Sequence, residues 1–267
     1  MPENQMEKST RQSESKVSIY KVVPSAITII GMCFGLTSIR MSLEGFHELA
    51  ASLILMAAVA DGLDGLAARQ LNAVSKFGAE LDSLTDFLCF GVAPSILLYC
   101  MFTNELGSFG WGATLVFVAA CCLRLARFNA FQQNSMNPKH EEVQNVDVFA
   151  TTEKPKTHFI GVPAPGGALL VLLPVFFGFS SSDSIGVSPY LVAAWLCIIG
   201  TLMISRLKTF SPKTIRIPIR SVTLSLLSIV VFGALLYSYT WQTFMIISTI
   251  YACMLIVDVI KAKGKII

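Results

Sequence analysis

Long apolar segments separated by short polar connections dominate the chain. Segments near 20 residues recur, and about 20 apolar residues are needed for a helix to cross a bilayer. The pattern predicts an all-α integral membrane protein, a bundle of eight transmembrane helices. The expected ranges are 22–42, 48–68, 79–102, 109–130, 164–180, 188–205, 218–237 and 242–260. The fifth segment is the weakest, because it is short and contains Pro174.

The composition agrees with a membrane protein. The chain has 267 residues, of which 54% are hydrophobic and only 14% are charged. Soluble domains carry roughly a quarter charged residues, so a soluble globule is excluded. Residues 1–18 are polar and of mixed charge, and we expect them to form a disordered cytosolic tail. Residues 19–267 are expected to form one membrane domain in the lipid bilayer, with no nucleic acid as a partner.

The distribution of Lys and Arg predicts the orientation. If both termini are cytosolic, the outer loops fall near 43–47, 103–108, 181–187 and 238–241, and these contain no Lys or Arg. Cytosolic loops are the ones that carry an excess of Lys and Arg. This asymmetry favours eight spans and places the turn at 69–78 on the cytosolic side. In a bacterium, the membrane would be the plasma membrane.

Four aspartates interrupt the second and third apolar segments. Asp61 and Asp64 are three residues apart, and Asp82 and Asp86 are four apart, so each pair shares one face of a helix. The short turn between the two segments makes the helices antiparallel neighbours, which allows both pairs to converge. Converging carboxylates cannot all remain ionised without cations. Hard divalent ions take oxygen ligands, and Mg²⁺ is usually held by carboxylates together with substrate phosphates.

Two other interpretations of the aspartates stay open on these grounds. Acidic residues inside spans also serve as ion-pathway or proton-relay groups. They could instead pair with Arg124 and Arg127 and hold helices together.

The residues around the aspartates fit a phosphate-bearing ligand. Gly62, Gly65 and Ala68 leave room for a bulky group beside the second segment, and Gly78 does the same at the start of the third. Arg69 follows Asp64 by about one helical turn, and its guanidinium can donate two hydrogen bonds to a phosphate.

This pattern resembles the signature of the CDP-alcohol phosphatidyltransferases. The fixed positions are Asp61, Asp64, Gly65, Ala68, Arg69, Gly78, Asp82 and Asp86. The resemblance implies a membrane enzyme that uses two divalent metal ions, Mg²⁺ or Mn²⁺, usually as a homodimer. Such an enzyme displaces CMP from a CDP-linked lipid with an alcohol.

The resemblance also implies roles for these residues. Asp61, Asp64 and Asp82 would be metal ligands, and Asp86 would be a ligand or the general base. The nucleotide would be bordered by Gly65, Ala68, Arg69 and Gly78. Asp86 is the best candidate for the catalytic base, because it ends the motif and lies deepest in the third span, where a carboxylate can take the proton of an incoming hydroxyl.

The first span carries a related but altered motif. The family often has Pro-Asn-x-x-Thr there, and this chain has Pro24 to Thr28 with Ser25 in place of Asn. We expect Thr28 to lie at the nucleotide site. Gly31 and Gly35, four residues apart, are expected to serve close helix packing.

Two further stretches bear on the acceptor alcohol. "LRLARFN" (Leu123–Asn129) and "FIGVPAPGG" (Phe159–Gly167) together resemble the phosphatidylserine synthase branch of the family. One of Arg124 and Arg127 could bind the substrate's phosphate and the other the carboxylate of serine. Either Asn129 or a loop carbonyl near Gly161 to Gly166 could bind the ammonium group of serine. Arginines at the cytosolic end of a span also serve topology alone.

The predicted function is transfer of a phosphatidyl group from CDP-diacylglycerol to L-serine, giving phosphatidylserine and CMP at the cytosolic face. One alternative is the same chemistry with choline, inositol or glycerol phosphate. Two others are a cation transporter that uses the same aspartates, and a non-catalytic protein that binds a CDP-lipid.

Overall fold

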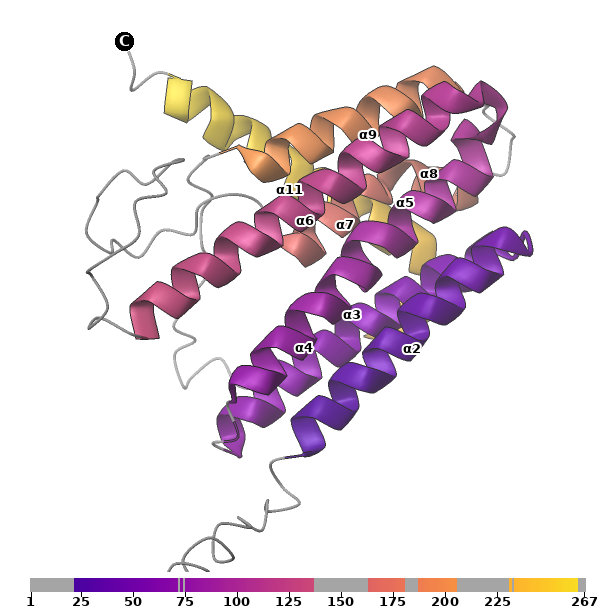
Figure 1. Cartoon of the computed structure of the whole chain (residues 1–267). Helices are drawn as coiled ribbons and strands as arrows, with labels where there is room; N and C mark the ends of the chain where they lie inside the picture. The colour runs from indigo at the N-terminus through magenta and orange to yellow at the C-terminus, as the bar shows by residue number, and fades with distance from the viewer. Residues whose placement is uncertain are drawn as a thin grey trace, which may run out of the picture.

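The described part of the chain is entirely helical (Figure 1). The structure is a computed structural model, and it describes residues 22–71, 73, 75–136, 163–180, 187–205, 231 and 233–263. The main helices are α2 (Val23–Leu43), α3 (His47–Gln70), α4 (Lys76–Asp86), α5 (Ala93–Leu98), α6 (Ser108–Met136), α7 (Ala164–Val171), α8 (Leu173–Ser180), α9 (Pro189–Ile204) and α11 (Thr240–Lys263). No strand occurs in these residues, which confirms the predicted helical class.

Among the residues that the structure describes, five helices are long and apolar enough to cross a membrane. They are Val23–Leu43, His47–Gln70, Lys76–Leu106, Ser108–Ala130 and Thr240–Val257. Pro189–Ile204 is apolar but shorter. The expected tail at 1–18, the polar connection after α6 and most of the expected seventh span, 218–237, lie outside the described residues.

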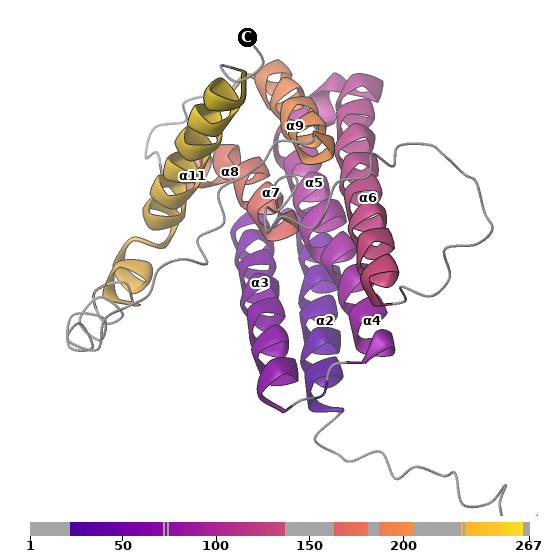
Figure 2. The ribbon, with the colours of Figure 1, turned by 90° about the vertical axis from the view of Figure 1, so that its left-hand side faces the viewer.

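A tight corner joins α2 to α3. Gly45 has φ +84°, a conformation that glycine adopts without a steric penalty. The N–H groups of Gly45 and Phe46 donate to the carbonyls of Ser42 and Met41, at 3.3 and 2.9 Å. This is the hydrogen-bond pattern of a Schellman motif. It makes α2 and α3 an antiparallel pair, and α2 also packs against α4 and α5 (Figure 2).

The third span is not a uniform α-helix. α4 ends at Asp86, and a π-helical segment, η2 (Phe87–Val92), follows before α5 begins. Pro94 lies in the first turn of α5 and lacks the N–H that would continue the α-helical hydrogen bonds. A second π-helical segment, η3 (Tyr99–Thr103), and a short 3₁₀ turn, η4 (Asn104–Leu106), complete the span. π-Helical turns within helices occur frequently at functional sites, and this one directly follows an aspartate.

The expected fifth span consists of two short helices. α7 ends at Val171, and α8 begins at Leu173, one residue before Pro174. Figure 2 shows the bend between them. Pro174, which made this segment the weakest predicted span, therefore lies where the helix is interrupted between α7 and α8.

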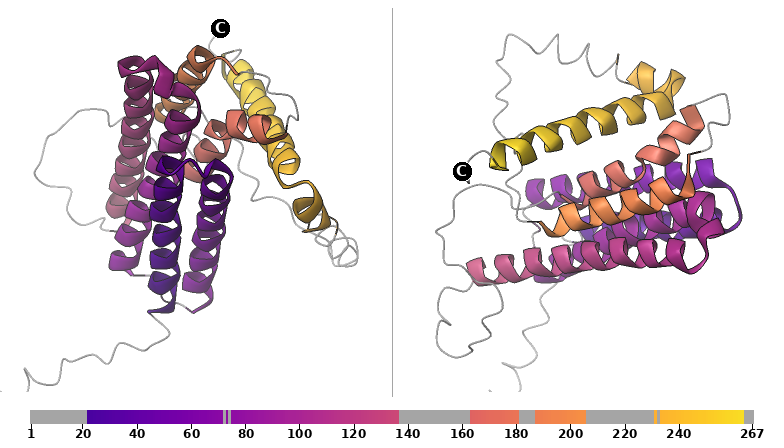
Figure 3. Two further views of the ribbon diagram at one scale, coloured as in Figure 1. Left: turned by 90° about the vertical axis from the view of Figure 1, so that its right-hand side faces the viewer. Right: turned by 90° about the horizontal axis from the view of Figure 1, so that it is seen from above.

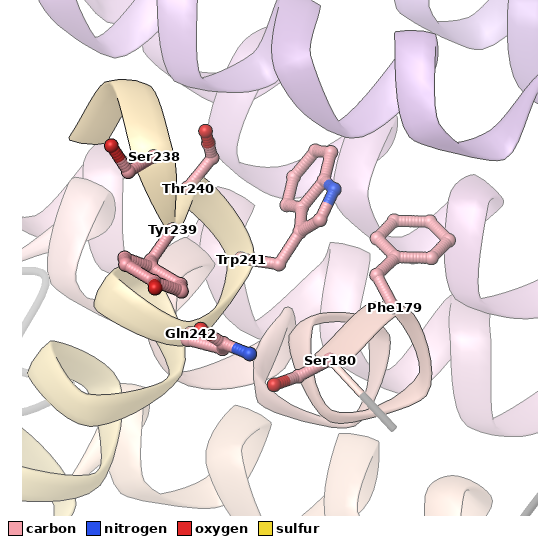
Figure 4. A pocket seen from close by; sticks show the side chains of 7 residues that line it. All are labelled: Phe179, Ser180, Ser238, Tyr239, Thr240, Trp241 and Gln242. Carbon is pink, nitrogen blue, oxygen red and sulfur yellow. The ribbon is translucent and has the colours of Figure 1, made fainter. Parts of the chain in front are cut away.

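α11 lies at an angle to the bundle formed by α2 to α6 and packs on α7 and α8 (Figure 3). Trp241, near its start, has its ring centroid 4.8 Å from that of Phe179 and 6.3 Å from that of Phe176. A small pocket lies beside this aromatic contact and is lined by Phe179, Ser180 and residues 238–242 (Figure 4). Its lining contains no ionisable carboxylate or cation, so we give it no part in the predicted chemistry.

Glycines allow α2 to approach its neighbours closely, as predicted for Gly31 and Gly35. A methyl group added at Gly31 would lie 3.4 Å from Ala60 Cβ, and one at Gly35 would lie 2.6 Å from Cys89 Sγ. The Cys89 thiol also donates to the carbonyl of Gly31 at 3.4 Å. These contacts fix α2 between α3 and the third span.

Substituting Gly35 with alanine should therefore destabilise the fold. We expect Gly35→Ala to be less stable by about 1 to 3 kcal/mol, the usual cost of overpacking, than the control Gly112→Ala. Gly112 is also helical but has open space around it, so the two variants share the gain in helix propensity. Thermal unfolding in detergent measures the difference. Adding Cys89→Ala should restore most of the loss, and no recovery would contradict this account.

Candidate metal and phosphate site

Three aspartates come together at the end of the bundle where α3 ends and α4 begins. Asp61, Asp64 and Asp82 each offer a carboxylate oxygen, and these oxygens lie within 4.8 Å of one another. Asp64 is buried, with 6% of its surface exposed, and the other two are half-buried. The helical spacing and the short α3–α4 connection produce this convergence, because each pair of aspartates shares one face of its helix.

Thr28 of α2 supports one member of this cluster. Its hydroxyl donates to Asp64 Oδ2 at 2.6 Å and lies 3.0 Å from the carbonyl of Pro24. A hydrogen bond of this length to a carboxylate is typical of a charge-assisted bond. Thr28 was expected at the nucleotide, and the structure places its hydroxyl on a predicted metal ligand.

Loss of this hydroxyl should weaken metal binding. Partners of metal ligands typically contribute 10- to 100-fold to affinity, so we expect Thr28→Val to raise the Kd for Mn²⁺ by about tenfold or more. Thr28→Ser should keep the affinity. Titration of the purified protein with Mn²⁺ in the absence of substrate measures it. Thr37→Val is a suitable control, because the Thr37 hydroxyl bonds only within α2, to the carbonyl of Cys33. Equal affinity of Thr28→Val and wild type would exclude this role.

Asp86 extends the cluster towards the middle of the span. Its side chain contacts that of Asp61, and its Oδ1 atom is buried and has no hydrogen-bond partner among the described residues. Arg124 of α6 is close enough to interact electrostatically with Asp86. A buried carboxylate oxygen without a partner is costly, so this atom is suited to a ligand that the cluster receives.

The small residues leave one side of the cluster open. A methyl group added at Gly62 would meet nothing within 4 Å, and one at Gly65 would meet only the Arg69 side chain, at 3.6 Å. Arg69 is exposed, and its Nε donates to the carbonyl of Gly65 at 3.0 Å. Ala68 is half-buried on the same helix. This side of α3 can therefore accept a bulky anionic group.

Gly78 lies in the first turn of α4. Its N–H donates to Ser75 Oγ, the N-cap of the helix, at 3.0 Å. Such caps stabilise a helix start by about 1 kcal/mol. A methyl group added at Gly78 would lie 3.1 Å from Ser75 Oγ and 3.9 Å from Ser25 Oγ, so the glycine keeps this corner open next to α2.

The three residues expected to bind the acceptor have different neighbours. Arg124 interacts electrostatically with Asp86, but Arg127 is exposed and donates to the carbonyl of Ile204, the last residue of α9, at 3.3 Å. Asn129 Oδ1 accepts a hydrogen bond from Ser83 Oγ at 3.0 Å, which joins α6 to α4 next to Asp82. Ser83 was not among the predicted site residues, although its position directly after an aspartate was a usable signal.

The donor set fits divalent cations. Oxygen ligands of one Mg²⁺ lie about 3 to 4 Å from one another, and the three carboxylate oxygens approach this spacing. Among the described residues, Arg124 is the cation that interacts electrostatically with Asp86. Two or more carboxylates at such distances need cations to remain ionised.

These features define a class. The chain is a helical integral membrane protein with a cluster of aspartates that could hold a metal ion. Residues 21–203 match the CDP-alcohol phosphatidyltransferase family. Because the match covers more than half of the 267 residues, the chain belongs to this family, and it is a membrane-bound transferase of phospholipid biosynthesis.

Named relatives give the same classification. A CDP-diacylglycerol–serine O-phosphatidyltransferase of Mycobacterium leprae is 32% identical over 233 residues, which are 87% of this chain and 73% of that protein. One of Mycobacterium bovis is 32% identical over 198 residues, 74% of this chain and 64% of that protein. One of Bacillus subtilis is 33% identical over 187 residues, 70% of this chain and 88% of that protein.

Proposed function

We propose that this protein transfers the phosphatidyl group of CDP-diacylglycerol to L-serine and releases CMP. The serine Oγ–phosphorus bond forms at the phosphorus that bears the diacylglycerol. The bond from that phosphorus to the oxygen bridging to CMP breaks, and the hydroxyl proton of serine passes to a carboxylate. Relatives that carry this activity in their names support the choice of serine.

Different residues of the site would bind the metal ions, bind the nucleotide and accept the proton. Asp61, Asp64 and Asp82 would hold the divalent ions, with Thr28 fixing the orientation of Asp64. When bound, two such ions stabilise negative charge on the attacked phosphate and on the leaving CMP. Arg69 and the open faces of Gly65, Ala68 and Gly78 would receive the nucleotide phosphates. Asp86 would accept the proton of the serine hydroxyl through its unpartnered Oδ1.

One observation carries this proposal most directly. Three carboxylates from two helices lie within 4.8 Å of one another, and the fourth, Asp86, contacts Asp61 and has a buried oxygen available. A pyrophosphate held at the first three would place its phosphorus within reach of the fourth. Arg124, beside Asp86, would then supply the positive charge that a serine carboxylate needs.

A panel of acceptors tests the proposal. Purified protein with Mn²⁺ or Mg²⁺ and labelled CDP-diacylglycerol would be offered L-serine, choline, inositol and glycerol phosphate in parallel. We expect phosphatidylserine and CMP in equal amounts with serine, no product without divalent metal, and little product with the other alcohols. Product with another alcohol alone would replace serine but keep the chemistry. Metal-dependent ion uptake into proteoliposomes without release of CMP would favour the transporter instead.

We also propose the orientation and the assembly. The protein would have eight spans with both termini and the acidic cluster at the cytosolic face, where serine is available, and it would act as a homodimer. Residues 1–18 would form a cytosolic tail. Labelling of introduced single cysteines with a membrane-impermeant reagent tests the orientation, and chemical cross-linking in the membrane tests the dimer.

A further inference from the structure

Three helices from distant parts of the chain contribute groups that interact with Arg124 or with one another. They contribute Arg124 of α6, Gly166 of α7 and Tyr251 of α11. Arg124 interacts electrostatically with both Asp86 and Tyr251. A methyl group added at Gly166 would lie 2.7 Å from the Tyr251 hydroxyl oxygen. The last described helix therefore brings a phenol to the junction of the two sequence stretches that bear on the acceptor.

The groups at this junction are suited to a small anion. Arg124 Nε is buried and has no hydrogen-bond partner among the described residues. A guanidinium presents its N–H donors in a fixed planar fork, and a phenol adds one O–H donor that can rotate. Together they offer donors from two directions to a carboxylate. The negative aspartates nearby would otherwise repel such a group, so the positive charge of Arg124 is required.

We propose that Tyr251 is an acceptor-binding residue, whose hydroxyl donates a hydrogen bond to the substrate carboxylate that Arg124 holds. This inference rests on the proposed function, in which the acceptor is serine. Tyr251 lies beyond residues 21–203, the part of the chain that matches the family. It therefore adds to the site a residue from outside that region.

Gly166 has a defined role in this arrangement. Tyr251 is half-buried, and its ring and hydroxyl lie directly over the backbone of Gly166, with Cε1 at 3.0 Å from the position of an added methyl group. Any larger residue would displace the hydroxyl. Gly166 thus leaves room for the phenol in a position where it interacts electrostatically with Arg124.

The test is Tyr251→Phe, which removes only the hydroxyl. Hydrogen bonds to charged groups are the stronger ones, so we expect the KM for L-serine to rise by about tenfold or more. The KM for CDP-diacylglycerol and the Kd for Mn²⁺ should stay at wild-type values. L-Alanine keeps the carboxylate and the ammonium group but has no hydroxyl to react. Its inhibition constant against serine should rise by the same factor, because the loss is in binding.

Controls separate this role from packing. Tyr237→Phe changes a tyrosine that is 92% exposed and should leave all constants unchanged. Serinol, which lacks the carboxylate, should be used equally well by wild type and by Tyr251→Phe. Gly166→Ala should raise the KM for serine in the wild type, and by much less in the Tyr251→Phe background.

The outcomes distinguish the two proposals. If the wild type makes phosphatidylserine and Tyr251→Phe has an unchanged KM for serine, the role of Tyr251 is overturned while the proposed function stands. If both KM values and the melting temperature change together, Tyr251 is structural and the inference also fails. If the wild type forms no product with serine, both proposals fall.

Discussion

Asp86→Asn should abolish turnover while the protein still binds metal and nucleotide. The amide keeps the size of the side chain but cannot accept the proton of the acceptor hydroxyl. A positioned general base contributes about 10²- to 10⁴-fold to a rate, so we expect a fall of kcat in this range. The Asp86 oxygen without a hydrogen-bond partner among the described residues is the structural reason for choosing this residue.

Two measurements are needed for this variant. Release of CMP in the presence of serine gives kcat, and titration with Mn²⁺ and CMP gives the binding constants. Glu105→Gln is the control, because Glu105 is an exposed carboxylate at the other end of the third span. Wild-type turnover in Asp86→Asn would remove the residue from the reaction. A large parallel loss of Mn²⁺ binding would make it a metal ligand rather than the base.

Asp64→Asn should weaken metal and nucleotide binding together. This carboxylate is the most buried of the three that converge, and it accepts the short hydrogen bond from Thr28. The loss of a ligand should exceed the 10- to 100-fold effect typical of a ligand's partner. We therefore expect the Kd for Mn²⁺ to rise by more than about 100-fold and turnover at ordinary metal concentrations to disappear.

The measurement for this variant is Mn²⁺ titration with and without CMP. A high concentration of Mn²⁺ should restore part of the activity, which distinguishes a weakened metal site from a misfolded protein. Glu48→Gln, at the opposite end of the same helix and exposed, should behave like wild type. Unchanged metal affinity in Asp64→Asn would refute the assignment of the cluster as the metal site.

The sequence predicted those features that depend on helical spacing. The period of the helix puts Asp61 beside Asp64, and a short turn brings Asp82 back to them, so their convergence required no knowledge of distant packing. The close approach at Gly31 and Gly35 followed from the same spacing and is confirmed by the contacts with Ala60 and Cys89.

Features that depend on long-range packing could not be predicted. Arg124 and Arg127 are three residues apart, yet Arg124 interacts electrostatically with Asp86 and Arg127 donates to the carbonyl at the end of α9. Residues at that spacing point about 60° apart around a helix, and different neighbours on each side separate them. Tyr251 carried no signal at all, because a single tyrosine in an apolar helix is ordinary.

The irregular backbone of the third span could not be predicted from the sequence either. Pro94 indicated that the helix would be interrupted, but the π-helical turn at Phe87–Val92 begins seven residues before this proline. Such a turn arises where the surroundings hold the helix in a wider conformation, and the sequence around Asp86 contains no residue that demands it.

The placement of α11 has a consequence for how such proteins diversify. This helix packs on α7 and α8, whereas the aspartates are carried by α3 and α4 and supported by α2. Under the role proposed for Tyr251, substitutions in α11 would change the residues that contact the acceptor without disturbing the helices that carry the aspartates. The acceptor alcohol could thus change in evolution through substitutions in α11, while the metal-binding aspartates and the phosphate chemistry stay the same.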